Sequence, residues 1–247
     1  MHFVGFKKLS ILSLFVFLFT TYIIGQDLDG VRLGFGVGST IYWGSQMDNK
    51  IETNTLGKSE INSGLNFQIY KSFDNKNEFG IRFLSSELWS FKSNNQLALN
   101  NQFKELSFLY QRSLNQNIKL NHAPFTFNLL AGVGLLYYSA TFYTITDNNF
   151  KIFSSIGAGE KPVSDPSYLI KEKVPAISGI IGINMGFKLS PRFLLYFENS
   201  FSLSLDNRFT GNLSLKSKVP NNGFTYHALS LYLNWGNQKG RIGCPKF

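Results

Sequence analysis

The sequence predicts an all-β fold, an eight-stranded antiparallel up-and-down β-barrel, and three observations lead to that class. Apolar and polar residues alternate with a period of two along most of the 247 residues, as in strands with two different faces. The connecting segments alternate between short and long. Charged residues make up 16% of the chain, against about 25% in an ordinary soluble domain. The many aromatic residues exclude a disordered chain, and the single cysteine excludes a disulfide-stabilised fold.

The first 25 residues predict a secretory signal peptide. Lys7 and Lys8 form its basic start, an apolar run follows over residues 9–24, and Gly25 offers a small residue at the cleavage point. The alternative is an uncleaved membrane anchor, but this run is shorter than the roughly 20 residues that a spanning helix needs. The predicted domains are therefore a signal peptide at 1–25, a barrel at 26–236 and a C-terminal tail at 237–247.

Four alternating segments form the first half of the predicted barrel. The first and second place leucine, valine, isoleucine and phenylalanine on one face, with glycine and polar residues on the other, Arg32 among them. The third places three apolar side chains opposite Arg82, and the fourth places three opposite Glu105. These segments cover residues 31–43, 61–70, 79–84 and 105–111.

Four further segments complete the barrel. The first of them is apolar enough to suggest a membrane helix, but Asn128, several glycines and clean alternation favour a strand. The next two carry Lys188 and Glu198 on their polar faces, and the last ends in Trp235. These segments cover residues 125–138, 177–188, 193–203 and 228–235.

The connectors indicate how the strands are arranged. Both chain ends fall on the side of the short turns, which is the layout of outer-membrane barrels with short periplasmic turns and longer external loops. The predicted short connectors are 72–77, 113–123 and 189–192, and the predicted long ones are 44–59, 92–101, 144–173 and 204–223.

The two strand faces predict which side meets the solvent. A soluble, lipocalin-like barrel would point its apolar residues inward and carry charges outside. Here the charge-poor polar face of glycine, asparagine, serine, threonine and tyrosine suits a narrow, filled lumen, and the opposite face suits lipid. We therefore expect a transmembrane barrel, exported to the cell outer membrane, with outer-membrane lipid as its partner.

The last predicted strand carries a recognisable pattern. Leu229, Leu231, Leu233 and Trp235 alternate with polar or small residues and end in an aromatic residue. With the leader and the eight strands, this resembles the small eight-stranded outer-membrane β-barrels of Gram-negative bacteria, the OmpA/OmpX type, over roughly residues 30–236. The resemblance implies that these four residues are an assembly signal for the barrel-assembly machinery. The tail is similar to the ends of PorT-like barrels.

The charged residues of the inward face are the candidate site. Isolated charges in a narrow lumen would be costly, so we expect them to pair with one another. This predicts an ion-pair network that plugs the lumen, in a protein with a structural, adhesive or assembly-linked role. The alternatives are a narrow gated pore or transporter and, after that, a membrane-embedded lipid-modifying enzyme. The network residues are Arg32, Arg82, Glu105, Lys188 and Glu198.

The sequence predicts no enzyme, cofactor or metal site. The three histidines, His2, His122 and His227, lack metal-ligand spacing. His227 and Ser230 are three residues apart and so point to opposite faces of a strand, which argues against a lipid-modifying hydrolase.

The remaining expectations concern partners. Cys244 in the tail is either a free thiol or a disulfide partner of another protein. The long loop 144–173 and the tail are the candidate contacts for a protein partner. No nucleic-acid motif is present.

Overall fold

The computed structural model describes residues 30–44, 60–74, 76–92, 96–114, 125–146, 149–158, 162, 167, 169–190, 192–211 and 222–235. The predicted signal peptide and tail lie outside the described residues, as do His2, His122 and Cys244. Within the described part of the chain, no helix is long and apolar enough to cross a membrane.

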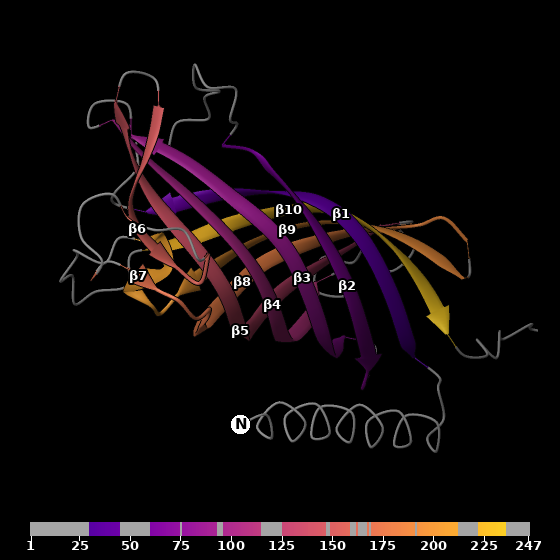
Figure 1. Cartoon of the computed structure of the whole chain (residues 1–247). Helices are drawn as coiled ribbons and strands as arrows, with labels where there is room; N and C mark the ends of the chain where they lie inside the picture. Colours follow the sequence, from indigo (N-terminus) through magenta and orange to yellow (C-terminus); the bar gives the residue numbers. More distant parts are fainter. Residues whose placement is uncertain are drawn as a thin grey trace, which may run out of the picture.

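The described strands close into an eight-stranded antiparallel barrel, as predicted (Figure 1). Each strand pairs with its neighbour in the sequence, β10 pairs with β1, and β4 pairs with β5. The barrel strands are β1 (Val31–Gly44), β2 (Asn62–Ser72), β3 (Asn77–Lys92), β4 (Leu97–Ser113), β5 (Phe125–Thr146), β8 (Val174–Lys188), β9 (Phe193–Ser204) and β10 (Asn222–Trp235).

We call the end where β1 begins and β10 ends the terminal end, and the opposite end the loop end. Three short elements lie at the loop end: β6 (Asn149–Ile156), β7 (Leu169–Ile170) and the 3-10 helix η3 (Asn207–Thr210). β6 pairs with the last part of β5, beyond the point where β5 leaves β8, and β7 pairs in parallel with β6. Part of the predicted external loop 144–173 is therefore regular structure.

The strand register decides which residues meet in the lumen. Directly opposed residues can be followed around the barrel from Arg32 until the path returns to β1 at Tyr42, ten residues closer to the loop end. Such a shear requires strands tilted by about 35–45° to the barrel axis. The path runs through Arg32, Tyr70, Gly80, Leu109, Gly132, Ile180, Ser202, Phe224 and Tyr42.

The predicted connector 92–101 is wrong. β3 continues to Lys92 and β4 already begins at Leu97, so two long strands meet there. Serine and asparagine residues interrupt the apolar pattern in this region and suggested a loop, yet strand pairing satisfies them. The Asn100 side-chain amide, for example, donates to the Glu87 carboxylate across the pair at 2.8 Å.

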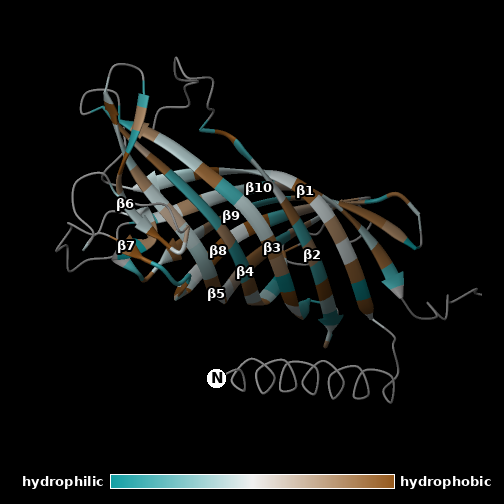
Figure 2. Cartoon of the chain, viewed as in Figure 1, coloured by the Kyte–Doolittle hydropathy of each residue, from teal (hydrophilic) through white to brown (hydrophobic). Residues whose placement is uncertain are grey.

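The outer wall is apolar along the middle of the barrel, and Figure 2 shows hydrophobic and hydrophilic residues alternating along the strands. Side chains that a soluble barrel would bury are half exposed here, which agrees with the predicted orientation of the two faces. Examples are Phe35 (58% exposed), Val37 (53%), Leu65 (53%), Phe108 (57%), Val133 (58%), Ile181 (66%) and Leu231 (47%).

The lumen is filled in layers that differ in chemistry. Near the terminal end, Arg32 lies among tyrosines, and the middle holds buried charges. The loop end is more apolar than the polar face that the sequence predicted for the lumen, because β3 and β4 are longer than expected and point leucine and phenylalanine inward. The loop-end cluster includes Tyr42, Leu84, Leu88, Leu99, Phe103, Leu136, Tyr138, Phe142, Ile156, Phe209, Phe224 and Tyr226.

Candidate functional site

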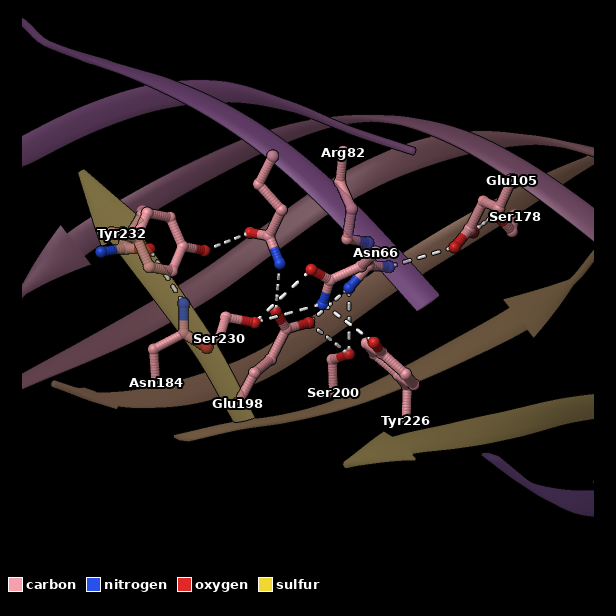
Figure 3. A network of polar contacts seen from close by, with 12 residues as sticks. Asn66, Arg82, Glu105, Ser178, Asn184, Glu198, Ser200, Tyr226, Ser230 and Tyr232 are labelled. Atoms are coloured by element: carbon pink, nitrogen blue, oxygen red, sulfur yellow. Dashed lines mark hydrogen bonds and ion pairs between the residues drawn. The ribbon is translucent and has the colours of Figure 1, made fainter. Parts of the chain in front are cut away.

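The centre of the lumen is a buried triad of charges, which we call the ion-pair layer: Arg82, Glu105 and Glu198. The Arg82 side chain is fully buried, and its Nη2 donates to Glu105 Oε2 at 3.1 Å. Its Nη1 donates to Glu198 Oε1 and, at 3.2 Å, to Ser200 Oγ. Figure 3 shows the guanidinium between the two carboxylates, which reach it from β4 and β9.

Neutral side chains satisfy the remaining carboxylate oxygens. Ser178 Oγ donates to Glu105 Oε1 at 2.6 Å, and Gln68 Nε2 donates to Glu198 Oε2 at 3.0 Å. Ser200 Oγ donates to Glu198 Oε1 at 2.8 Å. A buried ion pair is tolerated when further hydrogen bonds complete it, and here side chains from several strands supply those bonds. The layer therefore connects five of the barrel strands through the lumen: β2, β3, β4, β8 and β9.

Glycines make room for these long side chains. A Cβ atom added to Gly134 would lie 2.6 Å from Glu105 Oε1, and one added to Gly36 would clash with Ser230 Oγ. Both added Cβ atoms would lie much closer to these oxygens than van der Waals contact allows. The glycine-rich inward face seen in the sequence is thus the space into which the lumen network projects.

A second ion pair lies toward the terminal end. Arg32 pairs with Glu78 and donates to the Tyr196 hydroxyl at 2.5 Å. Its guanidinium also lies over the Tyr196 and Tyr232 rings, 5.1 and 5.6 Å from their centroids. The sequence did not predict Glu78 as a lumen residue, because the predicted strand began at residue 79, whereas β3 begins two positions earlier, at Asn77.

The structure separates the fifth predicted network residue from the other four. Lys188 lies at the end of β8 with an exposed side chain, and in the described residues it belongs to none of the four ion pairs. Parity placed it on the inward face, but the lumen has already opened to solvent at that level. Arg32, Arg82, Glu105 and Glu198 are inward and buried.

Four aromatic residues pack together inside the loop end, and we call them the aromatic cap: Phe103, Tyr138, Phe209 and Phe224. Phe209, carried by η3, is fully buried, with ring centroids 5.2 Å from Tyr138 and 6.2 Å from both Phe103 and Phe224. No sequence signal marked η3, because one short turn of helix in a loop has no periodicity.

Polar contacts hold η3 in place. Asn101 Nδ2 donates to the Phe209 carbonyl at 2.5 Å, and the Tyr138 hydroxyl donates to Asp206 Oδ2 at 3.1 Å. Asp206 also accepts from the backbone N–H of Arg208 as the N-cap of η3. The described first part of the connector between β9 and β10, residues 205–211, thus folds into the barrel mouth.

The residues of the predicted assembly signal lie on β10. Leu229 and Leu231 are exposed on the outer wall, at 50% and 47%, and Leu233 is half buried. The backbone of Trp235 pairs with that of Val31 at the terminal end.

His227 and Ser230 lie on opposite faces of β10. Ser230 is buried in the lumen, where it accepts from Asn66 Nδ2 at 3.3 Å, whereas His227 alternates with the inward residues and shares the outward face of the leucines. Among the described residues, no group of three histidine, cysteine or acidic side chains could hold a metal ion. In the lumen, Arg32 pairs with Glu78, and Arg82 pairs with Glu105 and Glu198.

Comparisons with known proteins give structural matches only. No family model and no curated protein matches the chain. Similar solved structures include Neisserial surface protein A (NspA; 8% identity, 84% of this chain and 98% of that chain, TM-score 0.49). Another is Ail, the attachment invasion locus protein of Yersinia pestis, with 13% identity over 83% of this chain and 98% of that chain and a TM-score of 0.45. A third is a major outer membrane protein from Thermus thermophilus, with 12% identity over 82% of this chain and 98% of that chain and a TM-score of 0.42.

Proposed function

We propose that this protein is an integral outer-membrane β-barrel whose lumen is closed by its own side chains, with a structural, adhesive or assembly-linked role. The main support is that apolar side chains lie on the outside of the barrel and charged side chains lie inside it, the reverse of a soluble protein. Phe35, Val37 and Leu65 are more than half exposed, whereas Arg82 and Glu105 are fully buried. A barrel in water would lose stability from such a distribution, whereas hydrocarbon favours it.

The closed lumen follows from the residues that fill it. An eight-stranded barrel has an interior just wide enough for side chains. The ion-pair layer occupies the middle and the aromatic cap occupies the loop end, so an ion would have to displace both. Closure supports a role carried by the outer surface and the loops rather than by transport.

Membrane fractionation tests the placement. The full chain, expressed in a Gram-negative host, is expected in the outer-membrane fraction. It should migrate faster on a gel before boiling than after, as a closed barrel does. Recovery as a soluble periplasmic protein would overturn the proposal.

Planar-bilayer recording tests the closed lumen. The purified protein is expected to insert without stable conductance, and the alternative of a gated pore requires reproducible open states. Stable large openings of the unmodified protein would contradict closure.

Two partners belong to the same proposal. Leu229, Leu231, Leu233 and Trp235 would be recognised by the barrel-assembly machinery, so replacing Leu231 and Trp235 with serine should lower outer-membrane yield more than replacing Ser230 with alanine. The loop 144–173 and the tail would carry any protein contact, which cross-linking in native membranes can detect.

A further inference from the structure

A row of four polar side chains crosses the outer wall of the barrel. Asn199 of β9 lies opposite His227 of β10, His227 lies opposite Ser39 of β1, and Ser39 lies opposite Ser63 of β2. All four are at outward positions, and none is fully buried. Residues from four strands, far apart in sequence, thus form one continuous line.

Apolar side chains border this row on the side of the terminal end. The adjacent outward row is Val37, Leu229 and Phe197, which are 53%, 50% and 44% exposed and lie opposite one another. On the loop side the next row is Ile41, Thr225 and Phe201. The polar row therefore lies where the apolar wall gives way to mixed residues toward the loop end, next to Thr225, whose Oγ1 accepts from Trp43 Nε1 at 3.1 Å.

Polar groups on such a wall are costly unless they serve a purpose, because lipid offers them no hydrogen bonds. Among the described residues, His227, Ser39 and Asn199 form no side-chain hydrogen bond that would give them a structural role. The lumen serines and asparagines, in contrast, belong to a dense network.

The order of the four residue types points to acyl-transfer chemistry. Directly opposed residues in an antiparallel pair have Cβ atoms about 4.5–5.5 Å apart, which lets a serine hydroxyl reach an imidazole nitrogen. Activation of a serine by a histidine that a third group orients is the general logic of hydrolytic triads. A neighbouring hydroxyl is a suitable donor to an oxyanion.

We propose that this row is a lipid-facing esterase site, with Ser39 as nucleophile and His227 as general base. Asn199 is the positioning residue that orients the imidazole, and the Ser63 hydroxyl donates to the developing oxyanion. The proposal rests on the membrane placement proposed above. It departs from the expectation of no enzyme, which rested on the opposite orientations of His227 and Ser230 on one strand, because Ser39 lies on the neighbouring strand opposite His227.

The substrate class follows from the surroundings. The apolar rows toward the terminal end offer a surface for a fatty-acyl chain, and the polar row would meet the carboxylic ester at its end. Membrane lipids with such esters are glycerophospholipids and acylated glycolipids, which share this chemistry.

The reaction balances without a cofactor. The Ser39 Oγ proton passes to His227 as Oγ bonds to the acyl carbon, and the released lipid alkoxide takes that proton when its C–O bond breaks. Water then attacks the acyl-serine ester, gives its proton to His227, and releases the fatty acid while Ser39 regains a proton.

The test uses the full-length purified protein in vesicles that contain a fluorogenic diacyl glycerophospholipid or, separately, an acylated glycolipid. We expect fatty-acid release from at least one lipid, and a loss of about a hundredfold or more in Ser39→Ala and His227→Gln. The matched control is Ser85→Ala, an outward serine on β3 that lies opposite Leu65 and Lys104, and its rate should equal that of the unmodified protein. An alkyl fluorophosphonate should label Ser39, and the label should be lost in His227→Gln.

Two further variants test the supporting roles. Asn199→Ala should lower kcat with little change in KM, and Asn199→Asp should restore part of the rate. Ser63→Ala should lower kcat about a hundredfold, as removal of an oxyanion donor does, and Ser63→Thr should recover it.

Absence of release and of Ser39 labelling, in protein whose gel mobility still changes on boiling, would overturn the esterase site and leave the barrel proposal intact. Full activity in Ser39→Ala would also overturn it. Loss of the gel shift would instead count against the barrel itself.

Discussion

The ion-pair layer and the aromatic cap fill the same lumen by opposite means. In the middle of the barrel, Arg82 of β3 joins one carboxylate from the adjacent strand β4 and one from β9, which is not a neighbour of β3. At the loop end, Phe209 packs among three aromatic rings and is held by a short helix outside the strand ladder. The first region is built into the wall, whereas the second is added to it from a connector.

This difference has an energetic consequence. A buried charge that loses its partner retains its full desolvation cost, so damage to the ion-pair layer affects the whole barrel. A missing ring in the cap leaves a cavity, and η3 can detach to relieve it without opening the strand pairs. The middle should therefore behave as part of the global fold, and the cap as a local unit.

The largest expected effect is that of Arg82→Ala. It leaves Glu105 and Glu198 buried without a cation and should lower the free energy of unfolding by about 3–5 kcal/mol. Urea unfolding in lipid vesicles, followed by the gel shift, measures it. Lys188→Ala, at an exposed site, is the control and should change stability by less than about 0.5 kcal/mol. A loss below about 1 kcal/mol in Arg82→Ala would mean that the layer is not the centre of the fold.

Phe209→Ala should have a smaller and more local effect. Removal of a buried phenylalanine costs about 3–5 kcal/mol in a core that cannot relax, but local release of η3 should reduce the global loss to about 2 kcal/mol. Protease cleavage of the connector between β9 and β10 should become faster, and the unfolding midpoint should move less than in Arg82→Ala. Stable conductance in this variant would show that the ion-pair layer alone does not close the lumen.

Asp206→Ala removes the N-cap of η3 and its contact with Tyr138. Loss of such a cap costs about 1 kcal/mol, and we expect faster cleavage of the same connector without a change in the gel shift. Asp206→Asn, which keeps an oxygen acceptor, should lose less. Equal cleavage rates for the unmodified protein and Asp206→Ala would show that Asp206 does not stabilise η3.

The smallest effect is the pH dependence of this cap. Burial raises the pKa of Asp206, but hydrogen bonds from the Arg208 side chain and backbone outweigh burial and hold the pKa below its ordinary value of 3.8. A depressed carboxyl pKa stabilises the fold above that value and loses its contribution as pH falls through the lower pKa. Protection of the connector should therefore decrease below about pH 4 in the unmodified protein. Asp206→Asn should show no such change.

Sequence and structure agree where a pattern is local. Alternation with period two located all eight barrel strands and the parity of Arg32, Arg82, Glu105 and Glu198, because side chains of a strand point to opposite faces at every step. It also separated His227 from Ser230. The alternation did not predict the ends of the strands. Serine and asparagine in β3 and β4 suggested a loop, but strand pairing satisfies their polar groups.

What the sequence by itself determined is which residues point outward and which point inward, since that depends on neighbours along the chain. Only the tertiary structure decided which of them meet. The register and the shear of ten residues, set by closure of the barrel, bring Glu105 and Glu198 to one guanidinium and place Ser39 beside His227. A one-residue slip in the register of a strand pair would turn the side chains to the other face and separate the residues of both sites. The candidate sites therefore depend on closure of the whole barrel, and no single segment determines them.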